Sequence, residues 1–257
     1  MNATLIGLTV AACVFAGGLG GLFLHSLLPE GHRNKETQDV VRLGTGMLSV
    51  LASLVLGLLI ATAKQSYDRM DQELRSYAAN LLLLNETLRD YGDGAATPRQ
   101  LLREHTIKVL HDIWPAIGFG RDGAPIKFED RVASILLEHV REAIRAMMPI
   151  DAGQKWLQDQ ALQISSSLLQ QRLLLIEQEG TSVQPVILVI LVSWISFIFA
   201  SFGLNAPRNA TVIGAFLVCS LAIGGAVFLV LEMDSPLRGV MKISSGPMEK
   251  ALTEMRR

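Results

Sequence analysis

The chain has 257 residues and a formal net charge of -1; half of its residues are hydrophobic and 18% are charged. This balance provides no strongly basic surface for nucleic acid, and no zinc, P-loop or dinucleotide-binding motif is present. The charges are concentrated between Lys64 and Glu179 and after Leu231. The composition therefore predicts one part of the chain in a membrane and another in water.

Four apolar runs predict four membrane-spanning helices: Ala3 to Leu28, Val41 to Ala63, Val183 to Leu204 and Thr211 to Leu231. Each run is about twenty residues or longer, which at ~1.5 Å per residue matches a hydrocarbon core of roughly 30 Å. Because the runs are continuous and do not alternate, they favour helices over barrel strands.

The first run lacks a preceding basic segment and a following small-residue cleavage site, so we expect it to be retained rather than removed as a signal peptide. Counting Lys and Arg near the membrane ends favours a multi-pass protein of the cell (inner) membrane with both termini and the central region in the cytoplasm. The two cysteines, Cys13 and Cys219, lie in apolar runs. They are interpreted as buried small apolar residues, with a disulfide inside the membrane as the alternative.

A regular apolar seam follows the second run. Spacings of three and four connect Tyr67, Met70, Leu74, Tyr77, Leu81, Leu84, Leu88 and Tyr91. No glycine or proline interrupts residues 61–91, so the second membrane helix is predicted to continue into the cytoplasm and to end at Gly92 and Gly94.

Three further helices are predicted in the central region. Thr97 and Pro98 are interpreted as the N-cap and first turn of one helix, which Trp114 and Pro115 end. After a glycine-rich link from Gly118 to Gly123, the next helix has the apolar face Phe128, Val132, Ile135, Leu136, Ala143, Ile144 and Met147. Asp151 is predicted to cap the last, whose apolar positions are Leu157, Ala161, Ile164, Leu168 and Leu175.

The predicted fold is therefore all-α, with four transmembrane helices in two pairs and a cytoplasmic helical bundle between the pairs. Residues 1–63 hold transmembrane helices 1 and 2, and residues 64–182 form the cytoplasmic helical domain. Residues 183–231 hold helices 3 and 4, and residues 232–257 form a cytoplasmic C-terminal segment.

Small and hydroxyl residues mark one face of each of the first two spans. The first span has Thr9, Cys13, Gly17, Gly21 and His25, and the second has Thr45, Ser49, Ser53, Gly57 and Ala61. One interpretation is close helix packing with hydroxyls bonded to backbone carbonyls. The other is a hydrated path on the axis of an oligomer. The candidate pore-lining residues are then Thr45, Ser49, Ser53, Leu56 and Ile60.

Few ionisable residues lie at the membrane ends. Glu232, Asp234 and Arg238 follow the fourth span. The carboxylates of Glu232 and Asp234 could form acidic rings at a cytoplasmic mouth, with Arg238 nearby. Alternatively, Asp234 could cap a turn or a helix start and pair with Arg238 four residues later. His25 is expected to reach the interface, and His105 and His111 are expected to be core or surface residues. No metal or cofactor site and no nucleophile with its base is recognised, so no enzymatic activity is predicted.

The C-terminal run from Leu231 to Ser244, which continues through Pro247 to Ala251 and Leu252, resembles the ending of the bestrophin-like family of bacterial and plant membrane proteins. That family's pattern is roughly LDxPF-x-G-x-I-x-V-S followed by a proline and a short helix. Here Ser235, Pro236 and Leu237 replace the usual Arg-Pro-Phe. Trp114 with Pro115, Gln171 with Arg172, and the long second helix also fit, so the resemblance covers nearly the whole chain.

The resemblance implies the architecture of bestrophins: homopentameric ion channels with cytoplasmic termini and a pore lined by the second helix. The bulky ring of the bestrophin pore neck is missing here, and so is the acidic calcium-binding run, so no calcium dependence is expected. We therefore expect a homo-oligomeric ion channel or passive pore for ions or small solutes in the lipid bilayer, a pentamer by resemblance. The alternative is a non-conducting membrane scaffold or sensor that uses the seam helix from Tyr67 to Tyr91.

Overall fold

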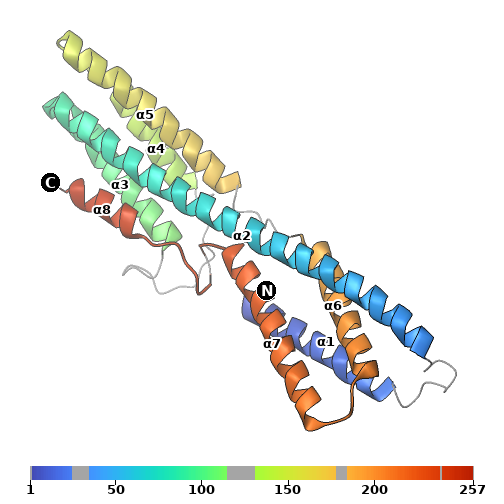
Figure 1. Cartoon of the computed structure of the whole chain (residues 1–257). Coiled ribbons are helices and arrows are strands. Elements are labelled where there is room, and N and C mark those ends of the chain that lie inside the picture. The colour runs from blue at the N-terminus through green and yellow to red at the C-terminus, as the bar shows by residue number, and fades with distance from the viewer. Residues whose placement is uncertain (1, 25–34, 115–130, 178–183, 238, 257) are drawn as a thin grey trace. The chain divides into compact units, whose positions relative to one another are not determined.

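The computed structural model describes residues 2–24, 35–114, 131–177, 184–237 and 239–256, and all regular elements in these ranges are helical. They are α1 (Ala3–Leu24), α2 (Lys35–Tyr91), the 3₁₀ turn η2 (Asp93–Ala95), α3 (Ala96–Ile113), α4 (Arg131–Arg145), α5 (Ala152–Glu177), α6 (Pro185–Asn205), α7 (Ala210–Met233) and α8 (Gly246–Glu254) (Figure 1). Of these, α1, α2, α6 and α7 are long and apolar enough to cross a membrane. The all-α fold with four apolar spans is thus confirmed.

The chain divides into two compact units, and α2 contributes to both. Residues Met1–Tyr67 and Thr181–Met241 form one, named here the membrane unit, and Asp68–Gly180 with Lys242–Arg257 form the other, named the polar unit. The segment after α7 is therefore divided between the two units at residue 241.

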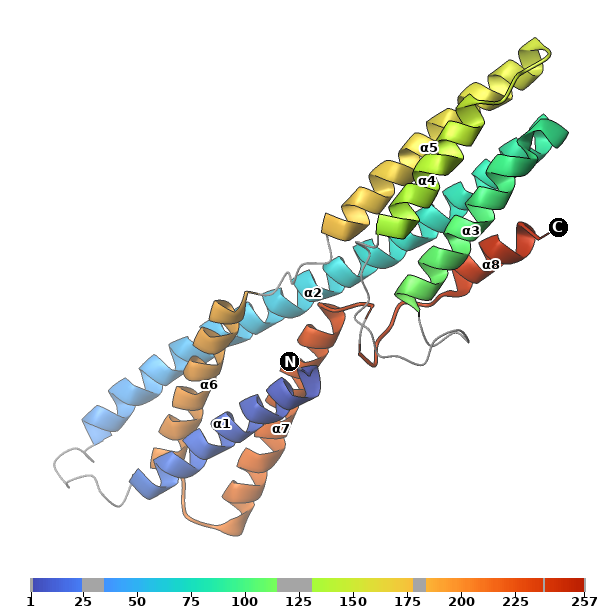
Figure 2. The same cartoon turned by 180° about the vertical axis from the view of Figure 1, so that it is seen from behind.

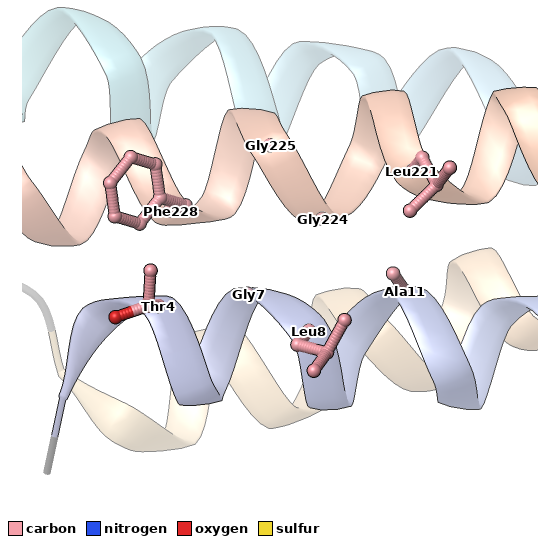
Figure 3. A pocket seen from close by; sticks show the side chains of 8 residues that line it. All are labelled: Thr4, Gly7, Leu8, Ala11, Leu221, Gly224, Gly225 and Phe228. Atoms are coloured by element: carbon pink, nitrogen blue, oxygen red, sulfur yellow. The ribbon is translucent and has the colours of Figure 1, made fainter.

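In the membrane unit, α1 packs closely on α6 and α7 because glycines line its contact faces. A Cβ on Gly17 would lie 2.6 Å from the carbonyl oxygen of Ser196, and one on Gly21 would overlap the carbonyl of Ala200. Gly7 faces Gly224 of α7 in the same way, as Figure 3 shows. Small residues at four-residue spacing let helix backbones approach in lipid, so Gly17 and Gly21 have the packing role predicted for them.

The membrane unit has its own apolar core. Phe199 of α6 and Phe216 of α7 lie with ring centroids 5.7 Å apart, and α2 adds Ala52, Leu59 and Ala63 to the same cluster. Outside the core, the side chain of Arg208 caps the C-terminal end of α1, because its Nη2 donates to the carbonyl oxygen of Leu22 at 2.9 Å. A cation at this position bonds to carbonyls that have no partner within the helix, and it interacts favourably with the partial negative charge at the helix C-terminus.

In the polar unit, α3 contacts α4 and α8, and α4 contacts α5 (Figures 1 and 2). The predicted seam of α2 is buried from Met70 to Tyr91, and Tyr67 is half-buried in the membrane unit. Hydrogen bonds from Tyr77 to His105 of α3 and from Asn80 to Gln171 of α5 link the seam helix to its neighbours. The helix predicted to extend to Tyr91 is confirmed.

The helix boundaries in the polar unit agree with the sequence in part. Gly92 ends α2 with a φ of 99°, a conformation that glycine adopts without a steric cost. The Asp151 carboxylate accepts from the Gln154 backbone N–H at 2.7 Å, which confirms the predicted cap of α5. The predicted cap at Thr97 is wrong, because η2 leads directly into α3 and Ala95 is its N-cap.

Two further expectations are corrected. Of the predicted face residues, Ile144 and Met147 are buried as predicted, but Val132 and Ile135 are about half exposed. Along the first part of α4 the buried positions are instead Ala133, Leu137 and Val140, because neighbouring helices select that face. Cys13 and Cys219 are free and exposed rather than buried, since they lie on the outer surface of the membrane unit. His25, Phe128 and the link from 118 to 123 lie outside the described residues.

Candidate functional site

The membrane part of α2 has one face buried within the protomer. Thr45, Ala52 and Leu59 repeat every seven residues, Ala63 follows four residues later, and all four are buried. At 3.6 residues per turn these positions form one stripe along the helix. This stripe contacts the rest of the membrane unit, so any surface that α2 offers to another subunit or to water lies on its remaining faces.

Thr45 belongs to that buried stripe. Its hydroxyl lies 2.9 Å from the hydroxyl of Ser201 on α6, and the two side chains are 3% and 4% exposed. Each hydroxyl can donate one hydrogen bond and accept others, so the pair satisfies a polar contact between two apolar helices. Ser201 was not among the residues predicted to have a role. The available signal was its position four residues before Asn205 in an apolar run, and Asn205 donates back to the Ser201 carbonyl at 3.0 Å.

Ser49 and Ser53 bond to their own helix. Ser49 donates to the carbonyl of Thr45 and Ser53 donates to the carbonyl of Ser49, each at 2.8 Å. Ser49 is half-buried and Ser53 is exposed. These bonds use the single donor of each hydroxyl and leave its oxygen free to accept from water.

A strip of small residues surrounds Ser53 on the exposed surface of α2. A Cβ added at Gly46 or Gly57 would meet nothing within 4 Å, and both positions are exposed. At the C-terminal end of this strip, Leu56 is half-buried and Ile60 is 39% exposed. We name Gly46, Ser49, Ser53 and Gly57, with Leu56 and Ile60, the small-residue strip.

Large apolar side chains occupy the other exposed flank of α2. They are Leu43, Met47, Leu51, Leu54 and Leu58, and each is at least 50% exposed. In a bilayer such a flank is satisfied by lipid or by an apolar neighbour. The α2 helix therefore presents three different faces: one buried in the protomer, one small and partly polar, and one large and apolar.

Glu232, a candidate for the cytoplasmic mouth, is buried at the end of α7. Its Oε2 accepts from the backbone N–H groups of Val240 at 2.6 Å and Met241 at 3.3 Å. Gly239 has a φ of 89°, and a Cβ there would overlap the carboxylate. The glycine thus permits the chain to fold back over Glu232, which holds the turn after α7 in place.

The other two candidates for the cytoplasmic mouth are Asp234 and Arg238. Asp234 is buried and is the C-cap residue of α7, with its backbone N–H bonded to the Val230 carbonyl at 3.0 Å. Arg238 lies outside the described residues. Among the described residues, no group of three or more His, Cys, Asp or Glu side chains could hold a metal ion.

A buried polar cluster joins four helices of the polar unit, α2, α3, α4 and α5. The hydroxyl of Tyr77 lies 2.7 Å from Nε2 of His105, and His105 Nδ1 lies 2.9 Å from the carbonyl oxygen of Ala133. Because a carbonyl can only accept, Nδ1 carries the proton and Nε2 accepts from Tyr77. Arg172 of α5, 3% exposed, donates from Nε to the Ser134 hydroxyl at 3.2 Å.

Burial controls the protonation of this cluster. Desolvation and, to a smaller extent, the positive charge of Arg172 lower the pKa of His105 to about 4, against the opposing effect of the bond to Ala133. Desolvation also raises the pKa of Tyr77 to about 12 against the opposing effect of Arg172. Both side chains are therefore neutral at pH 7. Of the two expectations for His105, core or surface, the structure places it in the core.

Comparison with known proteins gives a family and a fold. A family model described as the bestrophin-like domain matches residues 12–248. Two crystal structures of a bacterial bestrophin homologue from Klebsiella pneumoniae, each with one substitution, align with a TM-score of 0.67. The first is 10% identical in sequence, and the alignment covers 97% of this chain and 97% of that one. The second is 12% identical, and the alignment covers 97% of this chain and 95% of that one. A crystal structure of a membrane protein with one substitution is 14% identical, with a TM-score of 0.62 over 96% of this chain and 97% of that one. No curated protein matches.

Proposed function

Since the chain belongs to the bestrophin-like family, we propose that it forms a homo-oligomeric, passive pore for ions, with α2 beside the symmetry axis. The observation that carries this proposal is the difference between the two exposed flanks of α2. One flank is small and partly polar from Gly46 to Gly57, while the other is large and apolar.

The small-residue strip suits a hydrated path. Glycine and serine leave room near the helix backbone, and the back-bonded hydroxyls of Ser49 and Ser53 present oxygen atoms that can accept from water or coordinate a cation. Leu56 and Ile60 form the apolar part of the strip, and a pore can close at an apolar segment by losing water. Of the predicted lining residues, Thr45 contributes indirectly, because its hydroxyl holds α2 against Ser201 of α6.

The assembly proposed is a pentamer, by resemblance to bestrophins, in the cell (inner) membrane. The polar unit and both termini lie in the cytoplasm in this proposal, which rests on the distribution of Lys and Arg along the sequence. Ions, lipid and further copies of the chain are the expected partners. Catalysis has no part in the proposal.

The role of Glu232 at the cytoplasmic mouth has two forms. In the first, the carboxylates of Glu232 and Asp234, with Arg238, form a charged ring that selects ions. In the second, Glu232 is a structural residue that holds the turn after α7. The two backbone hydrogen bonds that it accepts favour the second form.

The seam helix is the basis of the alternative function, a non-conducting scaffold or sensor. The seam residues from Met70 to Tyr91 are buried against helices of the same polar unit. A partner helix could not dock on that seam without displacing α3 or α5. A scaffold would therefore have to use another face of α2 or transmit a movement through the unit as a whole.

Ion flux from liposomes tests the proposed pore face. Ser53→Trp places a bulky side chain on the small-residue strip, and Leu54→Trp places the same side chain on the large apolar flank as a control. We expect Ser53→Trp to reduce flux by at least tenfold without dissociating the oligomer, and Leu54→Trp to change it less than twofold. Equal flux in both variants would contradict the assignment of the strip to the pore.

A further inference from the structure

A pocket of about 510 Å³ lies at the end of the membrane unit where α2 begins and α6 ends. Its lining includes Asp39 and Arg42 from α2 and Phe202 and Asn205 from α6. Thr45 and Ser201, both buried and joined by their hydroxyl hydrogen bond, also line the pocket. All of these residues belong to the membrane unit.

The charges in this pocket are opposite in sign and lie one helical turn apart. Asp39 and Arg42 are three residues apart on α2, so their side chains leave the same side of the helix. Within the described part of the chain, no ion pair is formed by either residue. The pocket lining thus holds one carboxylate and one guanidinium, and these two charges cancel.

The remaining lining supplies hydrogen-bonding and apolar groups. Asn205 uses its Nδ2 to bond the Ser201 carbonyl, which leaves the amide oxygen as an acceptor. The pocket also lies at the C-terminal end of α6, whose partial negative charge favours a cation. Phe202 and Leu204 add apolar surface beside these polar groups.

We propose that this pocket binds a small zwitterion of the amino-acid class. The ligand's carboxylate pairs with Arg42, its ammonium group pairs with Asp39, and an apolar side chain contacts Phe202. A simple anion bound to Arg42 would not pair with the carboxylate of Asp39. A simple cation bound to Asp39 would not pair with the guanidinium of Arg42. A ligand with both charges can pair with both side chains at once. The site does not depend on ion conduction, so the two proposals can fail separately.

Isothermal titration calorimetry of the purified full-length chain in detergent tests the site with three probes of similar size. L-leucine has both charges, L-leucinamide has only the ammonium group, and 4-methylpentanoate has only the carboxylate. We expect L-leucine to bind at least tenfold more tightly than either analogue, because a charge-assisted hydrogen bond is worth roughly 1.5 kcal/mol or more, about a tenfold change in Kd.

Substitutions assign the two charges. Arg42→Gln is expected to weaken L-leucine at least tenfold while changing L-leucinamide little, and Asp39→Asn is expected to do the same for L-leucine while sparing 4-methylpentanoate. Lys64→Gln, a similar loss of charge on α2 outside the pocket lining, is the control and should leave Kd unchanged. No binding of any probe, equal affinity for L-leucine and 4-methylpentanoate, or equal losses in the control would each overturn the proposal.

Discussion

At the scale of single residues, His105 couples the stability of the polar unit to pH. Its pKa is about 4 in the folded chain and 6.5 when unperturbed, because burial disfavours the charged ring. The unfolded chain therefore binds more protons between these values, and stability falls as pH decreases from 6.5 towards 4. The full gap of about 2.5 pH units corresponds to roughly 3 kcal/mol.

The variant His105→Gln keeps a donor for the Ala133 carbonyl and an acceptor for Tyr77, but it does not titrate. We expect the melting temperature of the native chain to fall more steeply between pH 6.5 and 4.5 than that of His105→Gln, measured by differential scanning fluorimetry. Carboxylates that titrate in this range affect both proteins equally. Parallel curves for the two proteins would show that His105 is not responsible.

For Glu232, substitutions can distinguish a structural role in the turn after α7 from a role in ion selection. Glu232→Ala removes the acceptor for the N–H groups of Val240 and Met241, so the hydrogen exchange of these two amides should become at least tenfold faster. Glu232→Gln keeps an acceptor oxygen and should raise exchange much less. If Glu232 instead formed a selective acidic ring, Glu232→Gln would shift the reversal potential of the current while exchange stayed slow.

At the scale of elements, the contact of α1 with α6 depends on glycine. Gly21→Ala would place a methyl group on the Ala200 carbonyl, and only separation of the two helices could relieve the overlap. Overpacking of this kind costs about 1–3 kcal/mol. Gly20→Ala is the matched control, since its Cβ would meet nothing within 4 Å. We expect a lower melting temperature for Gly21→Ala alone, and a similar decrease in both variants would contradict the packing.

The helices themselves could be predicted because their signals are local. Apolar runs of sufficient length identified α1, α2, α6 and α7, and the seam from Tyr67 to Tyr91 identified the extension of α2. The face that each helix buries was harder to predict, because neighbouring elements select it. On α4, Ala133 and Val140 are buried while the larger Ile135 is half exposed.

Contacts between residues distant in sequence could not be predicted from the sequence. Thr45 and Ser201 are 156 positions apart, and each hydroxyl alone is equally compatible with a bond to its own helix. His105 showed no ligand spacing, and its link to Tyr77 depends on the packing of α3 against α2. The strip around Ser53 was predicted as a pore face, and it remains a prediction.

At the scale of the whole molecule, we propose that copies of this chain form a passive ion pore around α2. Four apolar helices, the bestrophin-like fold and a small-residue strip on α2 support that claim. A polar unit whose seam is already buried leaves the scaffold alternative without a free seam for docking.

The most direct test is the ionic current of the purified protein in a planar bilayer under a salt gradient, across a range of voltage and pH. From a passive ion pore we expect a current without any added energy source, with a reversal potential set by the salt gradient and a loss of current in Ser53→Trp. An intact oligomer that carries no current under any of these conditions would contradict it.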